Sequence, residues 1–286
     1  MQKISLLLLL LISIATGCSE SQQAVSMDHE PYILGHRGSG NTGYNSLGLT
    51  ENTLPSILKA MELLDGVEID IEMSRDSVVY VFHDSKIPAC GNIHLSCIPT
   101  SVSSQINAHN QCLPEDERIP TLREVFQALK ENNYQKFVSL DVKGWFEEEC
   151  IPGHNVNKVY QEVIAAEIAQ LIEEFQLAGK VFVETNYTVV LDEMKRIQPE
   201  TPTYLLGYGK LPHNIEYALK QGYDGISFSS FDSTLTQENV ETLHQSGLKL
   251  QLWTPNESQH LLKAKEYHPH FIQTDNVLEA KAILNN

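Results

Sequence analysis

Basic residues are scarce in this chain. Its 286 residues include 20 lysines and arginines against 37 aspartates and glutamates, so the formal net charge is −17 at pH 7. Binding to a nucleic-acid backbone calls for a basic surface, and this deficit argues against a nucleic-acid partner. A small anionic substrate remains compatible with the composition, because a few local cations can hold it.

The N-terminal apolar run is too short to span a bilayer. It extends from Ile4 to Ala15 and follows Lys3, which is the layout of a secretory signal. The following letters, ATGCSES, resemble a bacterial lipoprotein processing site. We therefore expect a signal peptide over residues 1–17, a lipidated Cys18 and a polar tether over residues 18–30. This predicts a protein that is exported and lipid-anchored to the bacterial cell envelope, on its periplasmic or outer surface. The alternative is an ordinary signal cleaved nearby, with an inert Cys18.

No CxxC element is present, so the remaining cysteines do not suggest a zinc site. Disulfides are possible in an exported protein. Four cysteines permit three pairings, and their spacing does not choose among them. The four are Cys90, Cys97, Cys112 and Cys150.

Short β-rich runs alternate with helical patterns along residues 31–286. Eight strands, each followed by a helix, predict a single (β/α)₈ TIM barrel of the α/β class. An open doubly wound sheet is the alternative, and it is disfavoured because no glycine-rich dinucleotide fingerprint follows the first strand. The eight expected strands cover residues 32–36, 66–73, 136–143, 180–186, 203–208, 224–229, 249–254 and 270–275.

Two features depart from this alternation. The run VVYVFHD (78–84) follows the second strand after only four residues, too few for a parallel crossover, so we expect an antiparallel hairpin strand or an extension. The segment of about residues 85–118 is long and short of periodicity, and it holds three of the four cysteines. We interpret it as an inserted excursion above the barrel, either a lid or a recognition surface.

The second strand, GVEIDIEM (66–73), alternates apolar and acidic residues. Alternate side chains share a face, so Glu68, Asp70 and Glu72 point together. If the apolar face packs on the helices, the carboxylates point into the barrel near the end where active sites lie. Buried carboxylates repel one another, and a hard divalent cation, Mg²⁺ or Ca²⁺, removes this penalty. The alternative is a solvated strand end.

The next strand carries a second inward pair. In KFVSLDVK, Asp141 and Lys143 share a face by the same parity. Asp141 is a candidate third metal ligand, and Lys143 can offset the charge or hold an anionic substrate. A plain ion pair between the two is the alternative, since buried charges are generally paired.

Two histidines come at the ends of neighbouring elements. GHRG ends the first strand with His36 and Arg37, and FHD ends the hairpin with His83. Imidazoles near a metal can act as acid and base because their reference pKa lies near operating pH. The Arg37 guanidinium is suited to bidentate phosphate binding.

These residues together resemble the glycerophosphodiester phosphodiesterase family. The matching motifs are GHRG (35–38), ENT (51–53), GVEIDI (66–71), HD (83–84) and TD (274–275), in the family's order. The resemblance implies the barrel already predicted. It also implies hydrolysis of a small glycerophosphodiester to sn-glycerol 3-phosphate and an alcohol.

The resemblance also implies individual roles. His36 and His83 would be the acid–base pair, and Glu68 and Asp70 would ligate the metal. Where the family usually has Glu in E-x-K, this chain has Asp141 in LDVK, one methylene shorter. Arg37 and Lys143 would bind phosphate. Trp253 would pack on the glycerol end, and Glu51 would bind or orient near the metal.

Two other functions stay open at this level. A phospholipase D-like or phosphoinositide-cleaving barrel would use the same site on intact lipid. A lipid-anchored protein that holds a phosphorylated ligand without cleaving it belongs to another class. The retained His36–His83 pair argues against the second, since binding alone needs no acid–base pair.

Overall fold

The computed structural model describes residues 30–41, 43–44, 47–144, 150 and 158–284. The predicted signal peptide (1–17), Cys18 and the tether up to residue 29 lie outside these residues. Within the described part of the chain, no helix is both long and apolar enough to cross a membrane.

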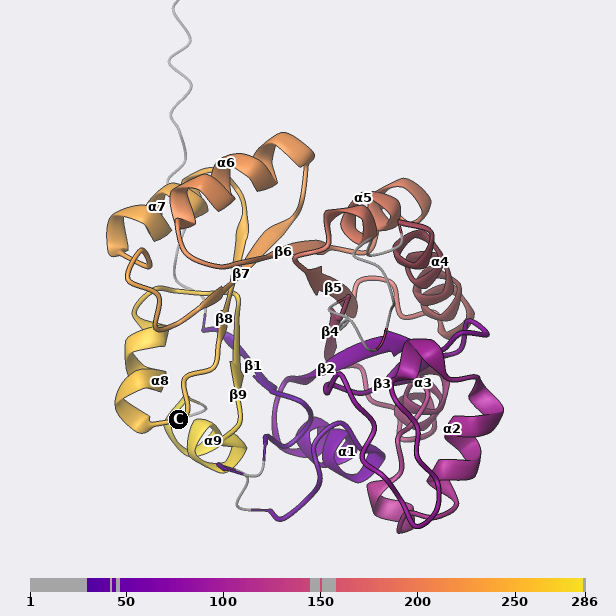
Figure 1. Ribbon diagram of the computed structural model, residues 1–286. Coiled ribbons are helices and arrows are strands. Elements are labelled where there is room, and N and C mark those ends of the chain that lie inside the picture. Colours follow the sequence, from indigo (N-terminus) through magenta and orange to yellow (C-terminus); the bar gives the residue numbers. More distant parts are fainter. Residues whose placement is uncertain (1–29, 42, 45–46, 145–149, 151–157, 285–286) are drawn as a thin grey trace, which may run out of the picture.

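Eight parallel strands form a closed barrel, seen end-on in Figure 1. β1 pairs with β9 through Tyr32↔Phe271 and with β2 through Leu34↔Gly66, which closes the ring. The TIM-barrel prediction is confirmed, and the open doubly wound alternative is wrong because β1 has a strand on each side. The strands are β1 (Tyr32–Gly35), β2 (Gly66–Met73), β4 (Phe137–Val142), β5 (Val181–Thr185), β6 (Thr203–Gly207), β7 (Gly225–Ser229), β8 (Lys249–Trp253) and β9 (Phe271–Thr274).

The extra strand β3 (Val79–Val81) lies outside the ring. It pairs antiparallel with the end of β2, with Ile71 opposite Val81 and Met73 opposite Val79. The short SRDS connection permits only this direction, so the hairpin prediction is confirmed. β3 directs the following chain away from the barrel axis and begins the inserted segment.

Helices surround the barrel and cover the outer face of its strands (Figure 1). On β2 the apolar residues Val67, Ile69 and Ile71 are fully buried in this outer core. Each helix presents apolar residues at helical spacing, and α3 begins with a capping box between Thr121 and Glu124. The surrounding helices are α1 (Leu54–Leu63), α3 (Leu122–Glu131), α4 (Lys158–Phe175), α5 (Thr188–Ile197), α6 (Leu211–Gln221), α7 (Gln237–Gln245), α8 (Ser258–Lys265) and α9 (Val277–Leu284).

Aromatic side chains fill the interior at the amino-terminal end of the strands. Phe182, Tyr204 and Phe271 form a buried cluster, with 4.7 Å between the ring centroids of Phe182 and Phe271. Their packing closes this end of the barrel. The polar residues further along the same strands therefore face the opposite, carboxyl-terminal end.

A second, smaller core joins the inserted segment to β3 and is formed by Tyr80, Ile87, Ile98, Ile106 and Ile119. The segment contains η1 (Ile98–Thr100), α2 (Ser103–Asn110) and η2 (Glu115–Glu117). The sequence pattern did not indicate α2. That helix buries only Ile106 and His109, so its sequence carries little apolar periodicity.

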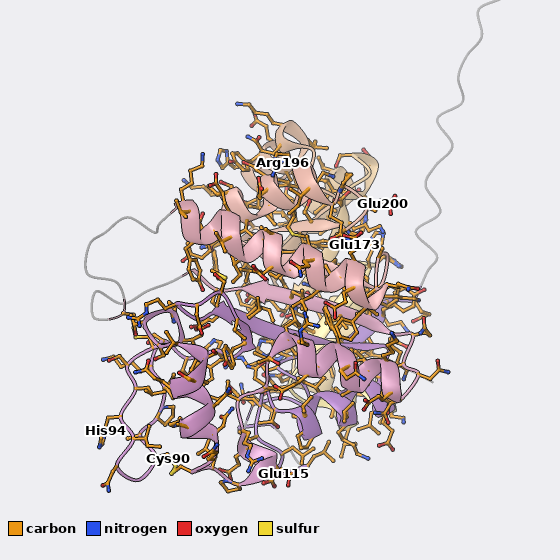
Figure 2. All side chains as sticks on the ribbon, turned by 90° about the vertical axis from the view of Figure 1, so that its right-hand side faces the viewer. Cys90, His94, Glu115, Glu173, Arg196 and Glu200 are labelled. Atoms are coloured by element: carbon orange, nitrogen blue, oxygen red, sulfur yellow. A yellow bond between two sulfur atoms is a disulfide. The ribbon has the colours of Figure 1, made fainter. Side chains whose placement is uncertain are left out.

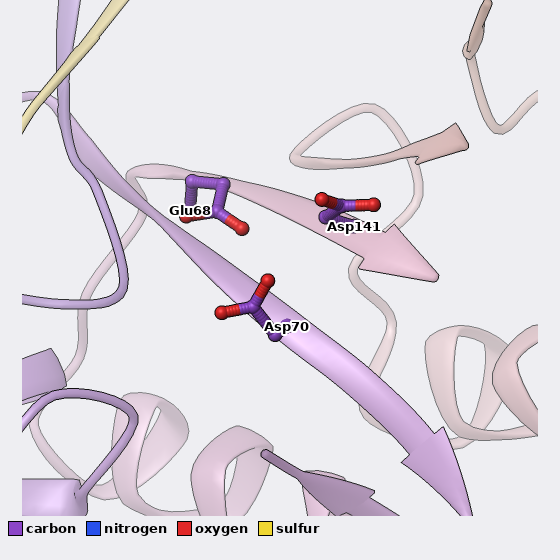
Figure 3. A group of neighbouring side chains, drawn as sticks. All are labelled: Glu68, Asp70 and Asp141. Carbon is purple, nitrogen blue, oxygen red and sulfur yellow. The ribbon is translucent and has the colours of Figure 1, made fainter. Parts of the chain in front are cut away.

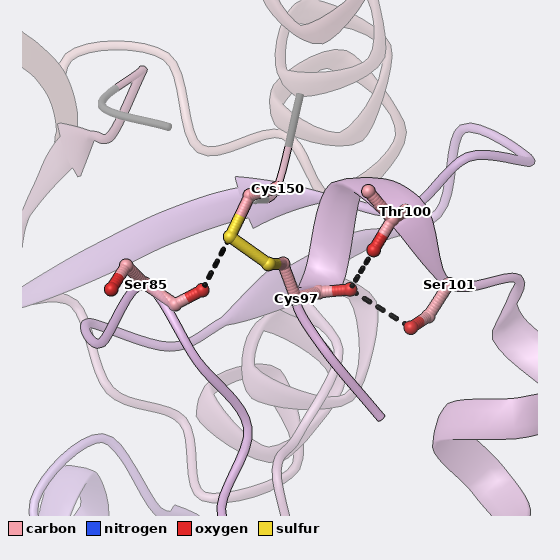
Figure 4. The surroundings of a disulfide bond; sticks show 5 residues. All are labelled: Ser85, Cys97, Thr100, Ser101 and Cys150. Atoms are coloured by element: carbon pink, nitrogen blue, oxygen red, sulfur yellow. Dashed lines mark hydrogen bonds between the residues drawn. A yellow bond between two sulfur atoms is a disulfide. The ribbon is translucent and has the colours of Figure 1, made fainter. Parts of the chain in front are cut away.

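Two disulfides hold the insertion. Cys90 pairs with Cys112 within the segment, and Cys97 pairs with Cys150, which follows β4. Figure 2 shows Cys90, His94 and Glu115 together at one end of the molecule, remote from Glu173, Arg196 and Glu200. Figure 4 shows the second bond, with the Cys97 carbonyl accepting from the hydroxyls of Thr100 and Ser101. This bond ties the insertion to the barrel.

Removal of the second disulfide is expected to destabilise the protein more than removal of the first. The bonds span 53 and 22 residues respectively. Because a cross-link restricts the unfolded chain more when its loop is longer, replacing both Cys97 and Cys150 by Ala should lower the free energy of unfolding by about 4 kcal/mol, against about 3 kcal/mol for Cys90 and Cys112. Urea denaturation under oxidising conditions measures both. An unchanged midpoint in the Cys97/Cys150 variant would contradict this assignment.

Candidate active site

Three carboxylates from two adjacent strands meet inside the carboxyl-terminal end of the barrel. Glu68 and Asp70 lie on β2, and Asp141 lies on β4 directly opposite Asp70. One ligand oxygen from each lies within 4.8 Å of the others (Figure 3). The strand parity of the sequence indicated this convergence. Glu72, on the same face, lies beyond this group.

Burial and mutual repulsion dominate the electrostatics of the three acids. Burial, with the neighbouring charges of Asp70 and Glu184, raises the pKa of Glu68 well above its usual range. Burial also raises the pKa of Asp141, reinforced by Asp70 and opposed by Lys143. For Asp70 burial is outweighed by Lys143, His83 and Arg37, so its pKa is lowered. Asp70 is therefore the firmly ionised member.

Lys143 bridges two of these acids. Its Nζ lies 2.9 Å from Oδ1 of Asp70 and also forms an ion pair with Asp141. Burial lowers the pKa of this lysine, but Asp141 and Asp70 outweigh burial and raise it. The ion pair between Asp141 and Lys143, which the sequence offered as the alternative to a metal ligand, is present and extends to Asp70. It places a positive charge beside the carboxylates.

The donor set fits a hard divalent cation. Its ligand atoms are carboxylate oxygens, the type that Mg²⁺ and Ca²⁺ prefer. The Arg37 backbone N–H donates to Oε2 of Glu68 at 2.8 Å, while Oε1 is buried without a hydrogen-bond partner among the described residues. A buried carboxylate oxygen without a donor is unfavourable unless a cation satisfies it. The site can therefore hold a metal ion.

Both histidines are oriented by carboxylates. Nδ1 of His36 lies 2.7 Å from Oδ1 of Asp275, and Nδ1 of His83 lies 2.9 Å from Oδ1 of Asp84. Since a carboxylate accepts the Nδ1 proton in each case, Nε2 is the nitrogen left to exchange protons. Nε2 of His36 is 3.8 Å from Oε2 of Glu68. The two imidazoles thus lie beside the acidic group.

Arg37 connects several of these groups. Nη2 lies 2.8 Å from Nε2 of His83, Nη1 donates to Oε1 of Glu51 at 2.9 Å, and Nε is 3.6 Å from Oδ2 of Asp70. The residue has a φ of 53°, in the left-handed region. Such a conformation is unfavourable for a non-glycine residue and is concentrated at functional sites.

Asn52, the middle residue of ENT, holds the same region together, although the sequence pattern indicated only Glu51. Its side-chain amide donates to Oδ2 of Asp70 at 2.7 Å, its side-chain oxygen accepts from the Asp70 N–H, and its own N–H donates to the Arg37 carbonyl. Asn52 also has a positive φ of 57°. It therefore sets the position of Asp70 relative to Arg37.

A cavity of about 240 Å³ opens above the carboxylates. Its lining includes the polar side chains of His36, Arg37, His83, Asp141 and Lys143 and the aromatic side chains of Tyr187, Tyr208 and Trp253. The Trp253 indole N–H is buried without a partner among the described residues, so it is available to a bound oxygen. The sequence pattern indicated neither tyrosine, because both follow their strands and no motif marks them.

Glu184 also lines this cavity and was not expected from the sequence. It lies on β5 opposite Asp141 and accepts hydrogen bonds from Ser139 and Gln273. Burial, helped by the charge of Asp141, raises its pKa to about 7. The alternation of side chains along KVFVETN would place Glu184 inside the barrel, but a single acidic residue in a strand is weak evidence for a site residue.

All the described residues expected at the site are brought together by the structure: the acids Glu51, Glu68, Asp70 and Asp141, the cations Arg37 and Lys143, His36, His83 and Trp253. Cys18 lies outside the described residues. Asp275 was noted only as part of the TD motif, and its contact with His36 joins residues 239 positions apart. That separation explains why the sequence alone did not assign it a role.

This chain is similar to known phosphodiesterases in sequence and in fold. A glycerophosphodiester phosphodiesterase of Caldanaerobacter subterraneus subsp. tengcongensis is 25% identical over 228 residues, which is 78% of this chain and 84% of that protein. A glycerophosphodiester phosphodiesterase from Parabacteroides distasonis superposes with a TM-score of 0.72 at 18% identity, covering 90% of this chain and 97% of that one.

A phosphodiesterase of Oleispira antarctica, solved in complex with the product sn-glycerol-3-phosphate, has the same fold. Its TM-score is 0.71 at 19% identity, with 90% of this chain and 98% of that chain covered. The fold and the site define a phosphodiesterase barrel. The family model for glycerophosphoryl diester phosphodiesterases matches residues 36–279, and the chain belongs to this family. It is accordingly a phosphoric diester hydrolase.

Replacing Asp275 by Asn should impair phosphodiester hydrolysis without unfolding the protein. Asn keeps the size and the contact with Asn256 but removes the carboxylate that orients His36. By analogy with other Asp–His pairs, kcat should fall roughly tenfold or more. Steady-state kinetics across pH tests this, since a purely structural role would leave the shape of the pH profile unchanged. An unaltered kcat and profile would show that Asp275 does not position His36.

Proposed function

We propose that the protein hydrolyses glycerophosphodiesters in a metal-dependent reaction, releasing sn-glycerol 3-phosphate and an alcohol. The supporting observation is the convergence of Glu68, Asp70 and Asp141 beside His36 and His83 at one cavity. Family membership and the product named for the Oleispira antarctica relative support the same substrate class.

Glu68, Asp70 and Asp141 would hold the divalent cation, Ca²⁺ or Mg²⁺. When bound, such an ion supplies Lewis-acid stabilisation of phosphoryl charge. The shorter side chain of Asp141, compared with the Glu usual in the family, is matched here by the close approach of Lys143, which holds that carboxylate toward Asp70.

Arg37 and Lys143 would bind the phosphoryl oxygens. A phosphodiester is anionic and repels nucleophiles, and its transition state carries additional negative charge. Both cations line the cavity, and both are already held in place by carboxylates. Because the groups are fixed before substrate arrives, little reorganisation is needed during the reaction. Glu51 holds the guanidinium of Arg37 and orients it.

His36 and His83 would exchange protons with the substrate. One imidazole accepts the proton of the attacking hydroxyl, and the other donates a proton to the departing alkoxide. Attack by water gives sn-glycerol 3-phosphate directly, whereas attack by the substrate's glycerol hydroxyl gives a cyclic phosphate that water opens in a second step. Asp275 and Asp84 hold the two Nδ1 atoms, and Nε2 is the acceptor nitrogen of each neutral ring; on His83 this nitrogen accepts from Nη2 of Arg37 before substrate binds. Trp253 would pack against the glycerol end, with its indole N–H available to a glycerol hydroxyl.

Chelation should abolish the release of glycerol 3-phosphate, and a divalent ion should restore it. The measurement is product release from glycerophosphocholine by the mature protein, with and without EDTA.

Replacing His36 by Ala or Asp70 by Asn should lower kcat at least about a hundredfold, as expected for loss of an acid–base group or a metal ligand. His213→Ala, on the exposed side of α6, is the matched control. Full turnover in EDTA, or in either site variant, would refute the proposed site.

We further propose that the mature protein is anchored to the cell envelope through a lipid on Cys18. The support is the signal layout and the ATGCSES sequence. Replacing Cys18 by Ser should move the protein from the membrane fraction to the soluble exported fraction, because the anchor is lost while the barrel is unchanged. Fractionation with immunoblotting measures this, and Cys18→Ser protein that still sediments with membranes would contradict it.

A further inference from the structure

A second cavity, of about 270 Å³, lies between the barrel mouth and the inserted segment. It adjoins the catalytic cavity, because His83 lines both, and Glu51, which holds Arg37, lines the second. The floor is largely apolar and is formed by Val81, Phe82, Pro88, Leu113 and Ile119. The two cavities therefore meet at His83, whose Nε2 lies 2.8 Å from Nη2 of Arg37.

His109 of α2 gives the cavity a specific polar character. The ring is 1% exposed, and Nε2 lies 2.8 Å from the Pro88 carbonyl oxygen. A carbonyl only accepts, so Nε2 carries the proton and a neutral ring has a lone pair on Nδ1. Nδ1 is buried without a partner among the described residues. A buried acceptor left unsatisfied is costly, and a ligand with an N–H or O–H donor would satisfy it.

Carboxylates outnumber cations around the cavity. Three carboxylates line it: Glu51, Asp84 and Glu117. The guanidinium in the lining belongs to Arg118, whose Nε donates to the Asn110 carbonyl. Glu51 is paired with Arg37, and Asp84 with His83. In the described part of the chain the Glu117 side chain has no hydrogen-bond or ion-pair partner. The cavity therefore offers one unpaired carboxylate, an aromatic face at Phe82 and a buried acceptor.

We propose that this second cavity binds the alcohol half of the substrate and selects an alcohol that carries a primary ammonium group. The ammonium would pair with Glu117, donate to Nδ1 of His109 and lie against the Phe82 ring, while the methylene groups contact the apolar floor. Ethanolamine has this chemistry. Glycerol lacks the charge, and choline lacks the N–H donor. This inference rests on the proposed phosphodiesterase function and adds a specificity site to it.

The test compares kcat/KM for glycerophosphoethanolamine, glycerophosphocholine and glycerophosphoglycerol in the metal-supplemented holoenzyme. The wild type should prefer the ethanolamine ester. Glu117→Gln should lower kcat/KM for that ester roughly threefold to tenfold, the range for one exposed charge-assisted contact, and should change the glycerol ester less than about twofold. Glu115→Gln, on the same short helix but outside the cavity, removes the same charge and should change neither.

A second variant, which fills the cavity with a larger side chain, tests whether the alcohol occupies the cavity independently of the charge of Glu117. Leu113 is half-buried and lines the cavity, so Leu113→Trp should lower kcat/KM for all three esters and leave the methyl ester of glycerol 3-phosphate little affected. Two results would overturn the alcohol site and leave the phosphodiesterase function intact. The first is that Glu117→Gln and Glu115→Gln lower kcat/KM equally for all three esters. The second is that Leu113→Trp has the wild-type kcat/KM for every ester. If the wild type hydrolysed no diester, the proposed function itself would fail, and the alcohol site with it.

Discussion

The repulsion among three carboxylates inside the barrel is the constraint on which its catalytic end depends. One oxygen each of Glu68, Asp70 and Asp141 lies within 4.8 Å of the others; Glu68 and Asp70 are buried, and Asp141 is partly buried. Two like charges 4 Å apart repel by about 4 kcal/mol at an effective dielectric constant of 20. The fold offsets this with Lys143 and Arg37, and the proposed metal ion would offset the remainder.

The backbone around the acids is shaped by the same requirement. Arg37 and Asn52 both adopt left-handed conformations, and Asn52 hydrogen-bonds the Arg37 carbonyl and both the N–H and the carboxylate of Asp70. These conformations are unfavourable locally and persist because the surrounding hydrogen bonds determine them. The result is a guanidinium and a carboxylate held in fixed relation before any ligand binds.

The site has two parts that differ in their chemistry. The central part carries cations and oriented histidines, which suit a phosphoryl group. The part beneath the insertion has an apolar lining, Glu117, whose side chain has no partner among the described residues, and the buried His109 nitrogen, and this combination suits an organic alcohol. The Cys97–Cys150 bond ties the insertion to the segment after β4, and β3 ties it to β2. This positions the second part against the first.

Local rules predicted the barrel and the inward acids, because strand parity depends only on neighbouring residues: Glu68 and Asp70 share a face whatever lies elsewhere. Parity likewise placed Asp141 and Lys143 on one face.

The disulfide pairing, the role of Asp275 and the bridge formed by Asn52 could not be predicted by such rules. Each depends on which segments meet in space. His36 and Asp275 are 239 residues apart and meet because β1 pairs with β9, whereas the disulfides depend on the fold of the insertion. The sequence by itself determined the type of chemistry and its strands. Only the tertiary structure decided which groups orient the histidines and that a second cavity adjoins them, because these contacts arise from closure of the ring and from the fold of the insertion.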